Sequence, residues 1–206
     1  MPRTDEATGL PVLDAEENPW GVTVFDCRGV FANMTSASSD PDIARRFVEG
    51  RASDGSGLVG AVLPFETRFR EPLYYPAKPF RAQGVVVMAG QMEDKWDVFR
   101  QADGLYFTRS WTGELVYRTQ IAVDGKTAYV LGIQSPEAFD PELAEREIDF
   151  LVVSYAFGMP FPHQLSPDLP KTASHVIARS WSHHGRRGCF PTYDDTLYAK
   201  RDVPWE

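Results

Sequence analysis

The chain has 206 residues, of which 43% are hydrophobic and 13% aromatic, and its formal net charge is −8. A chain of this length forms one medium domain or two small ones, and its hydrophobic content supports a buried core without a disulfide or metal staple. The excess of acidic side chains argues against a nucleic-acid binder, because neutralising phosphates needs a basic surface.

The number and spacing of the cysteines and the length of the apolar runs indicate the cellular compartment. Cys27 and Cys189 are the two cysteines, and thiols so far apart in sequence are typical of a reduced protein rather than a disulfide framework. The segment Met1–Asp14 lacks the apolar run of a signal sequence, and nowhere does the chain reach the roughly 18 consecutive apolar residues of a membrane span. We therefore expect a cytoplasmic protein that does not enter a membrane.

The first predicted elements are a polar arm, a strand and a helix. Residues 1–18 predict a flexible arm, and the β-branched and aromatic residues of Val22–Cys27 predict a strand. Asp40 and Pro41 are typical of a helix start, and Gly50 of its end. We expect this helix to pack on a sheet through one apolar face, which comprises Ile43, Ala44, Phe47 and Val48.

A turn and a proline-rich stretch follow. Asp54–Gly57 is typical of a flexible turn rather than a phosphate-binding loop, because no Lys-Ser or Lys-Thr pair follows the glycines. Recurrent prolines between Pro64 and Pro79 exclude a helix and predict an edge strand or an extended connector. A sub-domain boundary, if the chain has one, falls near 76–83. It separates an N-terminal strand-helix portion over 19–80 from a sheet and helix over 81–206, which we expect to form one compact unit.

The second half predicts an antiparallel meander. Apolar runs alternate with turn signals, and Asp-Gly between two such runs is a strong signal for a hairpin. Polar and apolar residues alternate within the runs, as they do in a sheet with one buried face. The runs are Gly84–Met88, Lys95–Arg100, Leu105–Trp111, Leu115–Val123 and Thr127–Ile133, and the joints are Ala102–Gly104, Thr112–Gly113 and Asp124–Gly125.

A long helix is predicted after the meander, from Asp140 and Pro141 to Gly158. Its apolar stripe should cover the open face of the sheet, and its acidic residues should form a solvated face. The stripe comprises Leu143, Ile148, Leu151, Val152 and Tyr155, and the acidic face Glu145, Glu147 and Asp149. Residues 172–182 fit either a short helix or a strand. The predicted class is therefore α+β, with an antiparallel meander covered by a long helix and a smaller N-terminal strand-helix portion.

The hairpin Met92–Gly113 carries the densest set of polar and aromatic side chains. Trp96 and Trp111 lie on neighbouring predicted strands and could pair across the ladder. Arg109 could stack on an aromatic ring, or pair with one of the acids at 93, 94 and 97. The functional alternative is a pocket for an anionic or carbonyl group, with Trp111 as a stacking wall and Arg109, Ser110 and Thr112 as its polar lining.

This hairpin resembles an uncharacterised bacterial module with the pattern Met-x-x-Lys-Trp followed by Leu-Tyr-Phe-x-Arg-Ser-Trp-Thr-Gly. The resemblance covers some 25 of the 206 residues, and the module is loosely associated with ADP-ribosylglycohydrolase-type proteins. It implies no established activity. Related sequences often have histidine where this chain has Thr108. The matching residues are Met92, Lys95, Trp96, Leu105, Tyr106, Phe107, Arg109, Ser110, Trp111, Thr112 and Gly113.

The C-terminal stretch is basic and contains all four histidines. His183, His184 and Arg186 are further binding candidates beside Cys189, and they raise two chemical hypotheses. Cys189 could be a nucleophile activated by its basic surroundings, or Cys189 could join a histidine and an acid such as Asp194 around zinc. Neither spacing matches a known signature, so the alternative is a glycine-rich surface loop with solvated side chains. We predict no metal and no cofactor.

Two functional hypotheses follow. The first is a non-catalytic binding or interaction protein of the immunity or regulatory type, whose acidic surface captures a protein partner or which takes a small anionic ligand. The second is a small hydrolase acting on a nucleotide-like or ADP-ribose-like substrate. The second requires the candidate residues to border one pocket rather than opposite faces, namely Arg109, Ser110, His183, His184 and Arg186.

Overall fold

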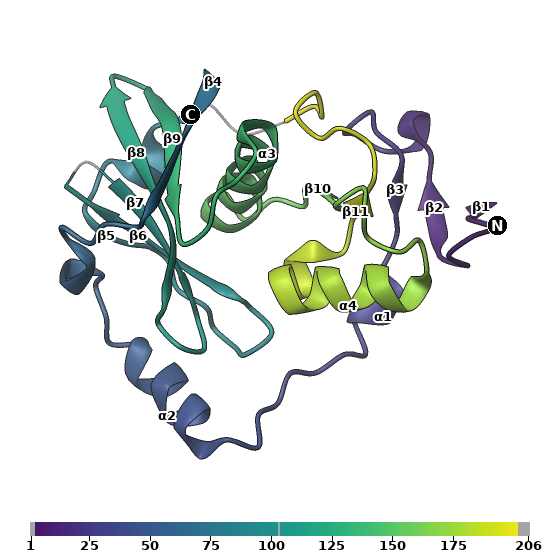
Figure 1. Ribbon diagram of the computed structural model, residues 1–206, viewed down its shortest axis with the longest axis horizontal. Helices are drawn as coiled ribbons and strands as arrows, with labels where there is room; N and C mark the ends of the chain where they lie inside the picture. Colours follow the sequence, from purple (N-terminus) through teal and green to yellow (C-terminus); the bar gives the residue numbers. More distant parts are fainter. Residues whose placement is uncertain (1–2, 103, 202–206) are drawn as a thin grey trace.

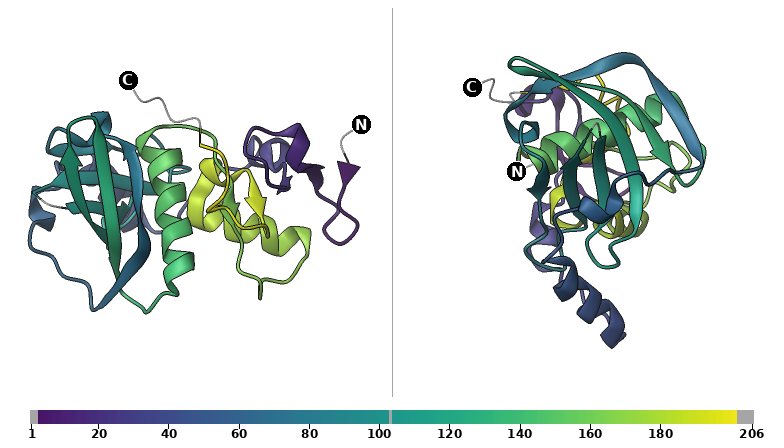
Figure 2. Two further views of the ribbon diagram at one scale, coloured as in Figure 1. Left: turned by 90° about the horizontal axis from the view of Figure 1, so that it is seen from above. Right: turned by 90° about the vertical axis from the view of Figure 1, so that its left-hand side faces the viewer.

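The computed structural model describes residues 3–102 and 104–201 and arranges them in layers (Figures 1 and 2). A six-stranded antiparallel sheet forms the first layer, and its strand order is β4-β9-β8-β7-β6-β5. Helix α3 covers one face of this sheet, and α4 with two small sheets lies beyond α3 (Figure 2). The strands are β4 (Phe65–Pro76), β5 (Gly84–Val87), β6 (Trp96–Gln101), β7 (Gly104–Arg109), β8 (Leu115–Asp124) and β9 (Thr127–Ser135).

The predicted meander is confirmed in strands β5 to β9. The connections between β7 and β8 and between β8 and β9 contain Gly113 and Gly125, whose φ angles of 71° and 58° suit glycine. Trp96 pairs with Arg109, and Val98 with Phe107, across β6 and β7. The proline-rich stretch is the edge strand β4, one of the two predicted alternatives. The expected turn at Asp103 lies outside the described residues.

Helix α3 (Pro141–Leu151) is the long helix that the sequence predicts. The Asp140 carboxylate accepts hydrogen bonds from the backbone N–H groups of Glu142 (2.9 Å) and Leu143 (3.3 Å). Ile148 and Leu151 are fully buried in the core against the sheet. A π-helical turn over Val152–Ala156 continues the helix. The predicted α+β class, with a helix over a meander, is thus confirmed.

The acidic residues of α3 do not form the predicted solvated face, because the helix is covered on both sides. Asp149 is 1% exposed, and its carboxylate accepts a hydrogen bond from Tyr75 (2.7 Å) and pairs with Arg201 (3.1 Å). Glu145 is also buried and accepts the backbone N–H of Arg70 at 2.6 Å. Packing against the sheet on one side and the C-terminal layer on the other explains the difference.

The layer beyond α3 contains α4 and the chain's N-terminal strands. The segment with two predicted alternatives is helical, and Thr172 caps it by accepting the backbone N–H of His175 at 3.4 Å. Residues of the expected N-terminal arm form β1 and β2, which pair with β3 in a small sheet. The elements are β1 (Arg3–Thr4), β2 (Pro11–Leu13), β3 (Val24–Phe25), α1 (Arg28–Phe31), β10 (His163–Gln164), α4 (Ala173–His184) and β11 (Pro191–Thr192).

Helix α2 (Pro41–Gly50) has the predicted bounds and cap, but its apolar face does not pack on the sheet. No α2 residue is buried, and Val48 is 68% exposed. The helix projects from the body (Figure 2), so its apolar face stays exposed and the predicted packing on the sheet is wrong. The residue after α2, Arg51, ties it to β6 through the buried Asp97 carboxylate at 2.6 Å.

The remaining helical segments are single 3-10 turns. In residues 3–102 and 104–201, no helix has the length and apolar character needed to cross a membrane. The 3-10 turns are Ala15–Glu17, Ser56–Leu58, Lys78–Phe80 and Gly185–Gly188.

Replacing the cap of α3 should destabilise the whole protein, whereas the same change at α2 should not. Asp140→Ala leaves two backbone N–H groups of a core helix without their acceptor, which lowers the unfolding free energy by about 1 kcal/mol. Asp40→Ala is the matched control, because α2 buries no side chain and can fray locally. Urea denaturation of both variants measures the difference, and equal losses would contradict the different roles of the two helices.

Candidate functional site

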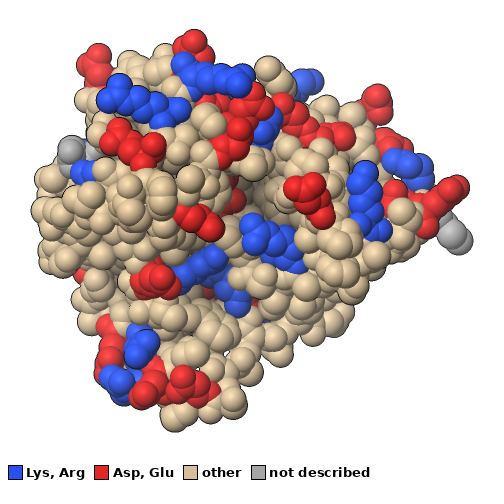
Figure 3. All heavy atoms as spheres, viewed as in Figure 1, with Lys and Arg blue, Asp and Glu red and all other residues tan. Residues whose placement is uncertain are grey.

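A cavity of about 500 Å³ opens where hairpin β6–β7, the coil before α2 and helix α4 meet. The hairpin contributes Lys95, Arg109 and Trp111, the coil contributes Ser36, and α4 contributes Trp181. We call it the Lys95 cavity. Figure 3 shows Lys and Arg side chains near the middle of the face drawn there, with Asp and Glu side chains beside them, although the protein as a whole is acidic.

Lys95 lies in a mixed polar and aromatic setting. Its ammonium donates hydrogen bonds to the Ser36 hydroxyl (2.7 Å) and the Met92 carbonyl (2.9 Å). The same nitrogen is 4.4 Å from the centroid of the Trp111 ring and 5.8 Å from that of Trp181. Burial lowers the pKa of Lys95 to about 8, so the charged form still predominates at neutral pH.

Arg109 is a largely buried cation that contacts no carboxylate directly among the described residues, although the charge of Glu147 acts on it from a distance. Its guanidinium stacks 4.0 Å from the centroid of the Trp96 ring and donates to the carbonyl oxygen (2.8 Å) and Nδ1 (2.7 Å) of His183. Within the described residues, no carboxylate lies within ion-pair distance of it. Burial lowers the pKa of Arg109, but a guanidinium keeps its charge.

His183 links Arg109 to helix α3. Because Nδ1 accepts the guanidinium N–H, the ring proton resides on Nε2, which donates to the Glu147 carboxylate at 3.1 Å. Burial opposes ionisation of Glu147, but the neighbouring His183 and Arg109 outweigh it, and the pKa of Glu147 lies below its ordinary value. Glu147 therefore orients His183, and His183 orients Arg109.

The ligand atoms of Glu147, His183 and His184 lie within 4.8 Å of one another, as in a metal site. A carboxylate with two imidazoles is a known zinc-binding set. A metal at Nε2 of His183 would need that nitrogen unprotonated, whereas the contact from Arg109 to Nδ1 keeps the proton there. The adjacent guanidinium charge also opposes a cation. The arrangement therefore fits a hydrogen-bonded support for Arg109 better than a metal centre.

His163 and His184 are core residues, and the prediction of solvated histidines in a surface loop is wrong for His184, which is 3% exposed at the end of α4. Their ring centroids are 4.5 Å apart. Burial lowers the pKa of His163 to about 4, and burial together with neighbouring cationic groups lowers that of His184 well below its ordinary value. Both rings are therefore neutral at physiological pH.

The end of α4 contacts the hairpin loop backbone to backbone. Gly185 has a φ of 58°, and a Cβ atom built on it would lie 1.8 Å from the carbonyl oxygen of Glu93. The N–H of Arg186 donates to the same oxygen at 3.3 Å. Only glycine fits this close approach, which fixes α4 against the β6 side of the cavity.

Trp96 and Trp111 do not pair with each other across the hairpin. Trp96 lies in the core, and Trp111 lines the cavity. Trp96 stacks on Tyr117 with ring centroids 5.4 Å apart. Trp111 lies beyond the end of β7, where its Nε1 donates to the Met92 carbonyl at 2.6 Å. The register explains the outcome, because it places Arg109 opposite Trp96.

The sequence-predicted site residues separate into four groups. Arg109 and Trp111 line the cavity, and His183 and His184 lie on α4 behind Arg109. Ser110 is 2% exposed, and its hydroxyl donates to the carbonyl of Asp94 at 2.6 Å, so it stabilises the loop. Arg186 is exposed, directs its guanidinium to Gln91 (3.3 Å) and does not line the cavity.

Ser36, Lys95, Trp181 and Glu147 were missed as site residues. Lys95 belongs to the motif that carries the resemblance, which is a signal that could have singled it out. Ser36 lies in a polar coil, 59 positions from the lysine that it contacts, and no local pattern marks it. Glu147 could not be distinguished from its acidic neighbours on α3 without knowledge of what covers the helix.

The two cysteines do not provide an activated thiolate. Burial raises the pKa of the Cys189 thiol to about 11 and that of Cys27 to about 12. Both are free, and the backbone N–H of Cys27 donates to the carbonyl of Cys189 at 2.9 Å. Asp194, the acid of the zinc hypothesis, instead accepts the backbone N–H of Thr23 at 3.0 Å. The thiol therefore stays protonated at neutral pH.

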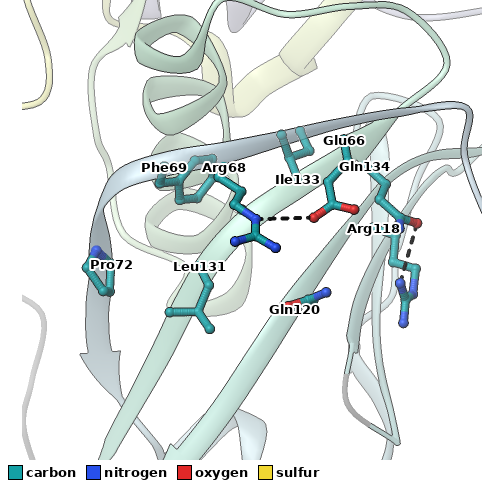
Figure 4. A pocket seen from close by; sticks show the side chains of 10 residues that line it. Glu66, Arg68, Phe69, Pro72, Arg118, Gln120, Leu131, Ile133 and Gln134 are labelled. Atoms are coloured by element: carbon teal, nitrogen blue, oxygen red, sulfur yellow. Dashed lines mark hydrogen bonds and ion pairs between the residues drawn. The ribbon is translucent and has the colours of Figure 1, made fainter.

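A second hollow, of about 300 Å³, lies against strands β4, β8 and β9 (Figure 4). Glu66 and Arg68 pair with each other at 3.7 Å, and the Arg68 side chain is 88% exposed. Arg118 donates to the side chain of Gln134 at 3.4 Å. Because its charged groups are solvated or engaged with neighbours, this hollow is a weaker candidate than the Lys95 cavity.

Comparisons with known proteins found no similar protein. Neither the protein-family models, nor the curated proteins, nor the solved structures gave a match to the chain. The functional proposal therefore rests on the side chains of the Lys95 cavity.

The buried histidines should make the protein sensitive to acid. His163 has a pKa of about 4 when folded and 6.5 when exposed, so between these values the unfolded chain binds more protons. The contribution of His163 to the unfolding free energy is therefore fully present above about pH 6.5. As the pH falls to 4, this contribution decreases by about 3 kcal/mol.

His163→Gln should flatten this dependence in denaturant titrations performed between pH 4 and 7. His175→Gln is the matched control, because His175 is exposed and should leave the slope unchanged. An unaltered slope in His163→Gln would contradict a buried neutral imidazole.

Proposed function

We propose that this protein binds a small anionic ligand that carries a planar ring, and that the ligand occupies the Lys95 cavity. The observation that carries the proposal is a pair of partly or largely buried cations, Lys95 and Arg109, that line one cavity. Neither has a carboxylate within ion-pair distance among the described residues. The nearby carboxylates of Glu147 and Glu93 act on these cations only through space. Burying a charge without a counter-ion in contact is unfavourable, and a bound anion would supply that contact.

The walls of the cavity suit a planar group. The indole rings of Trp111, from the hairpin, and Trp181, from α4, both lie near the Lys95 nitrogen. Stacking of a nucleic-acid base on an aromatic side chain contributes about 1–3 kcal/mol. A cavity of about 500 Å³ also falls in the range usual for small-molecule sites.

Nucleotides combine both features, an anionic phosphate and a planar base, and are the natural first probes. ADP-ribose joins AMP among them because the hairpin resembles a module associated with ADP-ribosylglycohydrolase-type proteins. The proposal favours the binding hypothesis over the hydrolase hypothesis, which requires all five candidate residues to border one pocket. His183 supports Arg109 from behind, and Arg186 points elsewhere.

Binding of AMP and ADP-ribose should change the tryptophan fluorescence of the protein saturably, because two indoles line the cavity. Lys95→Met should weaken binding at least about tenfold, which corresponds to the roughly 1.5–3 kcal/mol of a hydrogen bond to a charged group. Lys126→Met removes an exposed lysine in the β8–β9 turn and is the matched control. Adenosine, which lacks the phosphate, should bind more weakly than AMP.

Absence of saturation with both nucleotides would count against this ligand class. Equal binding of adenosine and AMP would contradict the role of the anion, and an equal loss in Lys126→Met would show a general effect of charge rather than a site.

Affinity for AMP should decrease as the pH rises from 7 to 9.5. The pKa of Lys95 is about 8, so its positive charge is present below this value and lost above it. The AMP phosphate is already doubly ionised throughout, since its second pKa is about 6. Lys95→Arg keeps the charge over the whole range and should flatten the profile, measured by fluorescence titration. A profile that is the same in both proteins would show that Lys95 does not meet the anion.

A further inference from the structure

We propose that Ser36 and Lys95 form a nucleophile–base pair that cleaves a carboxylic ester of a small anionic molecule within the Lys95 cavity. The inference rests on the proposed function, because the ester must enter the same cavity. It adds a reaction, acyl transfer to a serine, to the binding step.

The distance between the two groups is the first support. The Ser36 hydroxyl oxygen and the Lys95 nitrogen are 2.7 Å apart, which is within the reach expected of a nucleophile and its base. Both residues line the cavity, so a substrate carbonyl there can approach the hydroxyl. The carbonyl of Met92, at 2.9 Å, holds the same nitrogen and so orients the base.

The placement of Ser36 is the second support. Its backbone N–H donates to the Glu93 carboxylate at 2.9 Å, and this hydrogen bond lowers the pKa of Glu93. Glu93 and Lys95 belong to the same hairpin loop, so one short segment positions both the backbone of Ser36 and its base. Glu93 is therefore a positioning residue for the pair.

The surroundings of Lys95 also suit a base. Burial disfavours the ammonium form and outweighs the opposing charge of Glu93, so the pKa is about 8. Roughly a tenth of the lysine is then neutral at pH 7, against less than about a thousandth for an ordinary lysine. A base is most effective when its pKa lies near the working pH.

The reaction balances in two steps. The Ser36 oxygen attacks the ester carbonyl carbon as Lys95 takes the hydroxyl proton, and the oxyanion forms in the cavity that Arg109 also lines. The bond from that carbon to the alkoxy oxygen then breaks, and the leaving oxygen receives the proton from Lys95. Water, deprotonated by Lys95, attacks the acyl-serine and releases the carboxylic acid. The Ser36 oxygen leaves with the proton held by Lys95, so both residues return to their initial state.

Covalent labelling tests the pair directly. The intact protein is treated with a fluorophosphonate probe, and the adduct is located by peptide mass spectrometry. We expect one adduct, on Ser36, and a labelling rate that rises with pH around a midpoint near 8. Ser36→Ala should abolish labelling, and Lys95→Met should slow it about 100-fold or more, the usual contribution of a general base. Ser39→Ala alters an exposed serine of the same coil and should label normally.

Glu93→Gln tests whether Glu93 acts on Lys95 electrostatically. A purely structural role of Glu93 would not change the pH midpoint of the labelling rate. The negative charge of Glu93 raises the pKa of Lys95, so its removal should shift the midpoint of the labelling profile to lower pH. Thermal unfolding of each variant establishes that it is folded. An adduct on any other residue, or no adduct in the folded wild-type protein, would overturn the pair.

The test also separates this inference from the proposed function. AMP binding that persists in Ser36→Ala, together with the absence of a Ser36 adduct in the wild type, would reject the pair and retain the ligand site. A Ser36 adduct in a protein that binds neither AMP nor ADP-ribose would reject the nucleotide-like ligand and retain the pair.

Discussion

The buried guanidinium of Arg109 connects the layers of this protein. It belongs to β7, stacks on Trp96 of β6 and donates to His183 of α4, which in turn contacts Glu147 of α3. The indole nitrogen of Trp96 donates to the same His183 carbonyl at 2.9 Å. Sheet, α3 and α4 thus meet around one cation, and the Lys95 cavity lies where these elements converge on the hairpin.

The cavity contains two cationic side chains, although the chain as a whole is negatively charged. The chain has a net charge of −8, whereas its cavity is lined by Lys95 and Arg109, with the exposed Glu114 as the one acidic residue among the described lining. The general field therefore repels anions, while the two cations attract them at close range. This contrast disfavours long polyanions, which would meet the acidic surface, and suits a small anion that fits inside.

The sequence predicts the elements better than it predicts their surroundings. Glycine turns and alternating apolar residues are local signals, and they predicted the meander and the hairpin around Arg109 and Trp111. The environment of a helix face is not local. Val48 of α2 is exposed and Asp149 of α3 is buried, each opposite to prediction, because α3 alone occupies the space between the sheet and the C-terminal layer.

The cavity was foreseen in part for the same reason. Arg109 and Trp111, which the sequence singled out, come from the hairpin, where aromatic and basic residues are concentrated in sequence. Its contact between Ser36 and Lys95 joins positions 59 apart, and Trp181 arrives from a helix that the sequence left as one of two alternatives. Such long-range contacts depend on how the layers pack, and no periodic pattern in the sequence indicates them.

The backbone contact at Gly185 bears on how the protein could adapt to other ligands. Because helix and hairpin touch there through main-chain atoms, a larger side chain at Gly185 cannot be accommodated without moving the two elements apart. The coil that contains Ser36 belongs to neither a helix nor a strand, so the residues beside Ser36 can vary at little cost to the core. Ligand preference should therefore diverge through this coil, while the close contact of helix and hairpin keeps the two cations in place.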